Sequence, residues 1–175
     1  MQRNLVRVPY GYEPPEEARR GTLLIYDDFS DPRLVELEAI LKLAETKDFK
    51  EAVFYPIHEE TGKRMGLEDL APYYRRVDLL EELLADCQAS IPYKIDKWEG
   101  KRRKYTPVET ALSFLTDKYK GPYFLHLTEE MAARVAGFAS FKEWIRQIRL
   151  LVAPPYGHRL PPIMEEYASR WEYTR

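Results

Sequence analysis

The sequence predicts an α/β fold, namely a three-layer Rossmann-like domain around a mainly parallel sheet of about five strands. Two observations predict it. Short apolar runs of strand length alternate along the chain with segments whose apolar residues recur at helical spacing. A length of 175 residues also fits one domain of ordinary size. We therefore expect a single α/β domain over residues 21–175, preceded by an irregular N-terminal arm over residues 1–20.

The first unit of the alternation is a strand, a turn, a helix and a second strand. Apolar runs over 22–26 and 52–55 have the composition of buried strands. Between them we expect a helix from 32 to about 46, with Ser30 or Asp31 as its N-cap. Ligands of such units sit over the carboxyl end of the first strand. The intervening turn carries acidic residues where a phosphate-binding protein would have glycines and hydrogen-bond donors.

The rest of the chain continues the alternation. One later helix start has a specific signal, because Thr106 can cap, Pro107 suits the first helical position and Glu109 completes a capping box. In chain order we expect a loop over 57–70, a helix over 71–87, an extended segment over 91–98, a helix from 107 to about 118, a strand over 123–127, helical pieces over 129–136 and 141–147, a strand over 150–153 and a short helix within 163–171.

Composition excludes several classes of function. The formal net charge of −2 argues against a protein that coats nucleic acid by bulk electrostatics. Cys87 is the only cysteine, so the chain has no intrachain disulfide and no cysteine cluster for zinc. No apolar run approaches the roughly 20 residues of a membrane span, and the first residues lack the apolar core of a signal peptide. We therefore expect no membrane association and a cytoplasmic location.

A series of short landmarks follows an order and spacing that a known family shares. They are 25–32, 53–56 with the following Lys63, the helix opened by Arg76, Trp98-Glu99 before Tyr105-Thr106, the helix at 108–110, the strand at Phe124-Leu125, 141–144 and 149–154. From Gly21 to about Gly157 the chain thus resembles the nicotinate-mononucleotide adenylyltransferases of the nucleotidyltransferase superfamily. The resemblance implies a nucleotidyltransferase-like domain with a nucleotide pocket.

The resemblance also implies that the catalytic signature is degenerate. The family turn reads Gly-Gly-x-Phe-Asp-Pro-x-His-x-Gly-His, and its two histidines hold the triphosphate during adenylyl transfer. Phe29 matches the phenylalanine, but Arg33 and Glu36 stand at the two histidines and Val35 at the glycine. Adenylyl transfer needs positive charge on developing negative oxygens. A glutamate in an acidic turn works against it, although Arg33 can still pair with a phosphate.

Other expected site residues follow from the same alignment of landmarks. The family's acidic residue after the central strand maps to Glu129, and the aromatic that stacks on the pyridine ring maps to Phe141, with Trp144 nearby. Its arginine after the late strand maps to Pro154, and its second phosphate motif is not found before Arg175. The resemblance therefore implies ligand-binding roles for Phe29, Lys63, Arg76, Thr106, Glu129, Phe141 and Trp144, with no confident catalytic residue and no metal site.

Three functions remain open. The first is a degenerate nucleotidyltransferase relative that binds a nucleotide, a small ligand or a protein and has lost its chemistry. The second is an active enzyme that uses Arg33, Lys63 and Arg76 in place of the histidines, with Mg²⁺ and ATP as the only cofactors implied. The third is a structural or regulatory α/β protein without a nucleotide site. The acidic turn favours the first.

The remaining polar candidates have ordinary structural interpretations. His58 has no partner at metal-ligand spacing, and His126 in its apolar strand is expected to be a core or pocket-rim histidine. The basic run over 101–104 fits a solvated loop better than a phosphate or nucleic-acid site. Thirteen tyrosines, several of them in predicted loops, leave self-association open, because tyrosine is common at interfaces.

Overall fold

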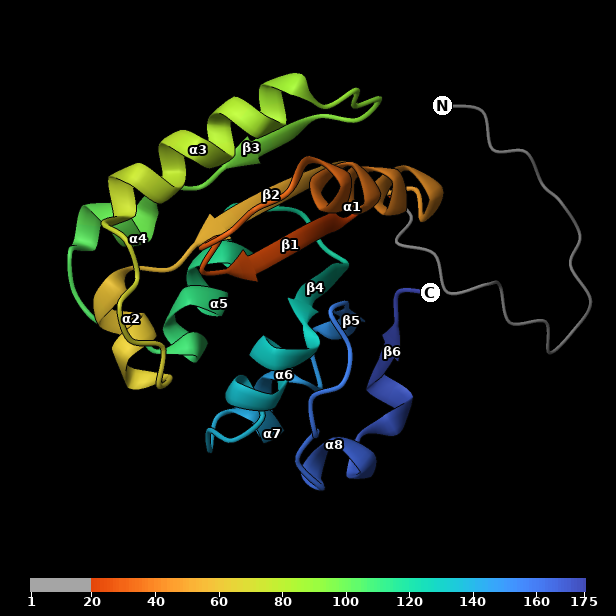
Figure 1. The fold of residues 1–175 in the computed structure, drawn as a ribbon. Coiled ribbons are helices and arrows are strands. Elements are labelled where there is room, and N and C mark those ends of the chain that lie inside the picture. The colour runs from red at the N-terminus through yellow and green to blue at the C-terminus, as the bar shows by residue number, and fades with distance from the viewer. Residues whose placement is uncertain (1–19) are drawn as a thin grey trace, which may run out of the picture.

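Residues 20–175 are described by the computed structural model, which places six strands in one sheet with helices on both faces (Figure 1). Apart from Arg20, the predicted arm lies outside the described residues. The order across the sheet is β3-β2-β1-β4-β5-β6, and every neighbouring pair is parallel. The strands are β1 (Thr22–Asp27), β2 (Glu51–Pro56), β3 (Tyr93–Ile95), β4 (Tyr123–Thr128), β5 (Arg149–Ala153) and β6 (Trp171–Tyr173).

The predicted Rossmann-like architecture is confirmed, with one strand more than expected. β1 and β2 are parallel neighbours, with Leu24 opposite Val53. The sixth strand, β6, pairs with β5 through Leu150 and Trp171. It lies within the last part of the chain, where only a short helix was expected, and three residues are too few to show a strand period.

Helices cover the sheet in two layers, because side chains along each strand alternate between its faces. On one face, Leu23 and Ile25 pack with α1 (Leu34–Thr46) and α3 (Tyr73–Asp86). On the other, Leu24 and Tyr26 pack in a second cluster with the helices α5 (Val108–Lys118), α6 (Glu129–Val135) and α7 (Phe141–Trp144). Three short helices complete the fold: α2 (Glu59–Arg64), α4 (Trp98–Arg102) and α8 (Ile163–Glu166), which a 3-10 turn (Ala168–Arg170) follows.

Two predicted helix caps are wrong. The N-cap of α1 is Arg33, without a side-chain hydrogen bond, rather than Ser30 or Asp31. The N-cap of α5 is Pro107, again without a side-chain bond. Thr106 lies one residue before this cap, where its hydroxyl donates to the Lys104 carbonyl and its N–H donates to Thr61 Oγ1 at 3.0 Å.

The predicted loop over 57–70 contains a helix. Its cap is His58, whose Nδ1 accepts the Glu60 N–H at 3.1 Å. His58, which was expected in a solvated loop, therefore caps α2. Its ring nitrogen accepts a helix N–H, as the side-chain oxygen of Ser, Thr, Asp or Asn usually does. None of the helices in residues 20–175 combines the length and the apolar character that a membrane span requires.

Candidate ligand-binding crevice

A crevice of about 840 Å³ opens at the carboxyl edge of the sheet, between the ends of β1 and β4. The chain leaves β1 toward α1 on one face and leaves β4 toward α6 on the other, so the two loops separate at this point. In open α/β sheets this switch point is where ligands bind. The volume is within the usual range for small-molecule sites, roughly 300–1,000 Å³.

The loop between β1 and α1 uses its own carboxylates to bind its backbone. Asp27 Oδ2 accepts the Phe29 N–H at 3.2 Å, and Asp28 Oδ1 accepts the Ser30 N–H at 2.9 Å. These are Asx turns, in which a carboxylate takes the N–H group two residues further on. They coincide with a left-handed backbone at Phe29 (φ 51°), whose ring is buried against Phe54. A loop of this kind has fewer donors to offer a phosphate.

The charge of the crevice is negative. Five carboxylic residues and two arginines of the described chain line it. Both arginines are paired within the lining: Arg33 lies 3.9 Å from Asp31 and 3.8 Å from Glu36, and Arg134 binds Glu130 at 3.0 Å. None of the ion pairs among the described residues includes Asp27 or Asp28. The surplus charge is thus concentrated on the loop after β1.

Asp27 differs electrostatically from the other acids. Burial and then the neighbouring Asp28 carboxylate raise the pKa of Asp27 from 3.8 to about 7, against the hydrogen bond from the Phe29 N–H. Two carboxylates on consecutive residues repel each other when both are ionised, and burial strengthens this effect. Asp27 is therefore partly protonated near neutral pH, and a cation placed beside it would favour its ionised form.

His126 lies at the floor of the crevice on β4. It is opposite Ile25 in the β1–β4 register and is only 6% exposed. Burial lowers its pKa from 6.5 to about 4, so the imidazole is neutral at physiological pH. A hydrogen bond between the ring and its own backbone acts in the opposite direction and raises the pKa, but burial outweighs it. A neutral imidazole in the crevice lining can either donate to or accept from a ligand.

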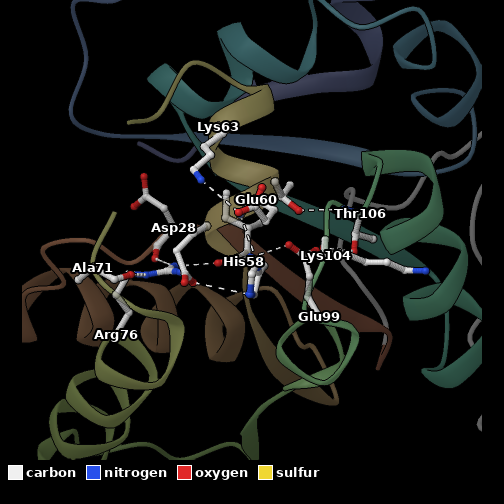
Figure 2. A network of polar contacts seen from close by, with 12 residues as sticks. Asp28, His58, Glu60, Lys63, Ala71, Arg76, Glu99, Lys104 and Thr106 are labelled. Atoms are coloured by element: carbon white, nitrogen blue, oxygen red, sulfur yellow. Dashed lines mark hydrogen bonds and ion pairs between the residues drawn. The ribbon is translucent and has the colours of Figure 1, made fainter. Parts of the chain in front are cut away.

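Arg76 binds the loop between β1 and α1 (Figure 2). Its guanidinium is 2% exposed and donates to four acceptors: the carbonyls of Ala71, Asp28 and Ile57 and the carboxylate of Glu59. The Nη1 distances are 2.7 Å to Asp28 and 2.8 Å to Ile57. All four acceptors belong to the protein, so the side chain expected at the ligand connects α3 to the ends of β1 and β2 instead.

A buried carboxylate joins the same region from α4. Glu99 is fully buried and accepts the Tyr55 hydroxyl at 2.7 Å and the His58 N–H at 2.6 Å. Burial raises its pKa, against these hydrogen bonds. Figure 2 shows Glu99 beside His58, at the start of α2. The contacts tie α4 to the end of β2 and leave Glu99 outside the crevice lining.

The expected site residues separate into three groups. Phe29, Arg33 and Glu36 line the crevice. Lys63 lies on α2, where it pairs with Glu60 at 3.1 Å, and Thr106 is buried behind it. The last group is buried within the protein and consists of Arg76, Glu129, Phe141 and Trp144. The rings of Phe141 and Trp144 meet edge to face in the core, with their centroids 5.1 Å apart.

Glu129 positions the turn after β5. Its Oε1 accepts the N–H groups of Gly157 at 2.8 Å and His158 at 2.7 Å, and its Oε2 accepts the Tyr173 hydroxyl at 2.9 Å. Burial opposes ionisation, but these hydrogen bonds hold the pKa of Glu129 below its usual value. The carboxylate therefore connects the start of α6 to the turn and to β6, close to Pro154 and Pro155 of the crevice wall.

Sequence reasoning missed the wall formed by α6. Met131, Glu130 and Arg134 line the crevice opposite α1. A signal was present, because these residues follow β4 directly and parallel strands end at the same edge of a sheet. Among the described residues, no group of three or more His, Cys, Asp or Glu side chains is placed to hold a metal ion.

Comparison with known proteins adds no relative, since no protein-family model matches the chain and no curated protein has significant sequence similarity to it.

Proposed function

We propose that this protein is a nucleotidyltransferase-like binding protein that holds a small ligand in the crevice between β1 and β4 and has no adenylyltransferase activity. The observation that carries the proposal is the pair of Asx turns after β1. The carboxylates of Asp27 and Asp28 occupy the N–H groups of Phe29 and Ser30. A triphosphate would need those donors and would also meet the negative charge of the same carboxylates.

Electrostatics supports the exclusion of polyanions. Like charges about 4 Å apart repel by on the order of 4 kcal/mol at an effective dielectric constant of about 20. The arginines of the lining offset little of this, because Arg33 and Arg134 already pair with carboxylates of the same crevice. An uncharged or cationic ligand meets no such barrier, and the apolar side chains of the walls suit a ligand with an apolar body.

The remodelled-enzyme alternative requires Arg33, Lys63 and Arg76 to converge on one phosphate. The geometry gives it no support. Arg76 is buried with four acceptors of its own, and Lys63 pairs with Glu60 on α2 outside the crevice lining. Arg33 alone is a single donor group between Asp31 and Glu36. Within residues 20–175, the preorganised positive charge that phosphoryl transfer needs is therefore not assembled.

Two measurements test the proposal. Purified protein with ATP, Mg²⁺ and nicotinate mononucleotide should release no pyrophosphate above a blank. Calorimetry should detect adenosine, which is neutral, and no ATP at the same concentration. Turnover that Arg33→Ala abolishes, or tight Mg²⁺-dependent binding of ATP, would refute the proposal. Binding of neither nucleoside nor nucleotide would favour a protein-interaction role.

A matched pair of variants isolates the role of the Asx turn. Asp28→Asn removes the charge but keeps an oxygen for the Ser30 N–H, whereas Asp28→Ala removes both. If the occupied N–H group excludes phosphate, Asp28→Ala should bind ATP more tightly than Asp28→Asn. Equal ATP affinities for the two variants would show that the carboxylate acts through its charge alone.

A further inference from the structure

Positive charge is concentrated outside the crevice, on the surface formed by α2, α4 and the loop after α4. We call this the α4 basic surface, and it consists of Arg64, Lys101, Arg102, Arg103 and Lys104. Arg102 is half-buried and the other four are exposed. None of the ion pairs within residues 20–175 includes any of these side chains. The surface shares no residue with the crevice lining, so its role is independent of the ligand proposed for the crevice.

The fold brings the two parts of this surface together. The Thr106 N–H, which follows the basic run, donates to Thr61 Oγ1 of α2 at 3.0 Å, so the loop after α4 lies against α2. The Arg64 guanidinium lies over the Tyr105 ring, 4.5 Å from its centroid. Figure 1 shows α2 and α4 at the same end of the molecule, and Figure 2 shows the Lys104 side chain extending away from the buried polar network. The run expected as a solvated loop is thus one part of a larger basic surface.

The basic run borders a hollow in the protein surface. Arg103 has a left-handed backbone (φ 57°) that ends α4, and both Lys101 and Arg103 line an open hollow of about 530 Å³. The other lining residues are Lys97, Gly100 and Tyr73. Lys97 already pairs with a glutamate of α3. No carboxylate of residues 20–175 lines this hollow, so a ligand there meets two cations that have no counter-charge.

Two arginines of the surface are positioned by aromatic rings. Arg64 lies over Tyr105, and the Arg102 guanidinium lies over Trp98, 4.9 Å from the ring centroid. A guanidinium stacked on a ring keeps the N–H groups of its edge, which match the two oxygens of a carboxylate. Arg102 also lies near the buried Glu99, where its charge opposes the rise in the pKa of that carboxyl. Stacking restricts these side chains before a partner binds, which lowers the entropic cost of binding.

The same contacts leave these rings unsuited to nucleic-acid bases. Single-stranded nucleic acid binds basic surfaces largely by stacking its bases on aromatic side chains. Trp98 is stacked on Phe114, with ring centroids 4.1 Å apart, and Arg102 lies over it. The Tyr73 ring is stacked with His58. An acidic protein segment needs cations but no free ring, so it fits this surface better.

The distribution of charge over the molecule supports an acidic partner at this surface. The formal net charge of the chain is −2, and the loop after β1 carries surplus negative charge. Salt screens exposed charges beyond about 8 Å at physiological ionic strength. A local cluster of cations therefore attracts an anionic segment in spite of the net charge. Complementary charge of this kind steers association and selects among partners.

We propose that the α4 basic surface binds an acidic segment of a partner protein, whose Asp and Glu carboxylates pair with Arg64, Lys101, Arg103 and Lys104 beside the hollow. Exposed ion pairs are individually weak. Several of them together give a complex that forms rapidly and depends strongly on salt.

Fluorescence anisotropy with the full chain at pH 7 tests the class of partner. The probes are a labelled octapeptide of alternating Asp and Glu, its counterpart of Asn and Gln, and an oligouridylate with the same number of negative charges as the acidic peptide. We expect the acidic peptide to bind with an affinity that falls as salt is added, and the neutral peptide to show no binding. Tighter binding of the oligouridylate would overturn the choice of a protein partner. Absence of binding by the acidic peptide would overturn the proposal.

Two triple variants of equal charge test the location. The first carries Lys101→Gln, Arg103→Gln and Lys104→Gln, and the control removes three exposed lysines elsewhere through Lys50→Gln, Lys120→Gln and Lys142→Gln. The first should bind the acidic peptide about tenfold more weakly, because it loses three exposed ion pairs. The control should keep its affinity within about twofold, since screening limits the effect of distant charges. Equal weakening by both variants would show that only net charge matters and would overturn the location. Unchanged thermal unfolding midpoints would show that both variants are folded.

Arg64 tests the part of the surface on α2. Arg64→Lys keeps the charge but replaces the planar guanidinium over Tyr105, whereas Arg64→Gln removes the charge as well. We expect Arg64→Lys to bind the acidic peptide more weakly than the wild type, and Arg64→Gln more weakly still. Wild-type affinity in both variants would contradict the placement of the segment against α2.

Discussion

Arg76 Nη1 donates to the backbone carbonyl of Asp28 at 2.7 Å, so a buried side chain of α3 fixes the loop that follows β1. The same nitrogen donates to the Ile57 carbonyl at the end of β2. One guanidinium thus holds the carboxyl ends of two neighbouring strands. The loop after β1 is thereby bound to the end of β2 through one buried side chain.

Replacing Arg76 should destabilise the protein severely. Arg76→Ala leaves four acceptors without their donor, among them the Glu59 carboxylate, which is bound at 3.0 Å. Breaking a buried pair by removing one partner costs about 3–5 kcal/mol, and we expect a loss of that size in the free energy of unfolding from urea denaturation. The neighbouring exposed Arg75→Ala should stay within about 0.5 kcal/mol of the wild type. Similar losses for both variants would contradict the structural role of Arg76.

Asp27 should make the protein less stable as the pH rises. Its pKa is raised from 3.8 to about 7, so the folded protein keeps a proton that the unfolded chain has released. The unfolded state binds fewer protons in this window, and the free energy of unfolding therefore falls between about pH 4 and pH 7. Asp27→Asn removes this contribution. In urea denaturation at pH 4.5, 6 and 8, the free energy of unfolding of the variant should rise relative to that of the wild type as the pH rises. If the two free energies change in parallel with pH, the raised pKa of Asp27 is refuted.

His126 should act in the opposite direction over nearly the same range. Its pKa is lowered from 6.5 to about 4, so between these pH values the imidazole is protonated in the unfolded chain and neutral in the folded protein. Stability attributable to His126 is present above about pH 6.5 and is lost as the pH falls toward 4. His126→Gln should therefore weaken the acid sensitivity of unfolding. In the wild type this slope partly cancels that of Asp27, so each contribution is measured as the difference between the wild type and the variant that lacks the group.

Glu129 should stabilise the turn after β5 through its charge. Glu129→Gln replaces an acceptor-only carboxylate with an amide that has one oxygen for the two N–H groups of Gly157 and His158 and the Tyr173 hydroxyl. We expect a loss of about 1.5–3 kcal/mol, the contribution of a hydrogen bond to a charged group. Tyr173→Phe should reproduce part of it in guanidinium denaturation, and the exposed Glu165→Gln on α8 should have no effect. An equal effect of Glu165→Gln would contradict this assignment.

The strands at the centre of the sheet could be predicted, because the pattern of apolar residues within each segment indicates them. β1, β2, β4 and β5 are runs of consecutive apolar residues, as strands buried on both faces must be, and each was expected within about a residue of its observed position. The short strand β6 was not predicted, because its pairing with β5 depends on a partner far away in sequence.

Helix starts were less predictable, because capping depends on where a side chain finds its best partner. Asp31 precedes Pro32 as an N-cap would, yet α1 starts later, at Leu34, and the donors of the preceding loop bind Asp27 and Asp28. Thr106 precedes a capping-box pattern, yet its N–H binds Thr61 across the structure. In both places, hydrogen bonds outside the expected motif decided the outcome.

The sequence alone determined that the turn after β1 is the acidic end of a buried strand, because composition and period are properties of neighbouring residues. Only the tertiary structure decided what that turn faces. In the folded protein Arg76 donates to the carbonyl of Asp28, and Lys63 pairs with Glu60 on α2. His126 and α6 line the same cavity. These relationships join residues from four separate elements. Their geometry follows from strand order and packing, which no local stretch of sequence encodes.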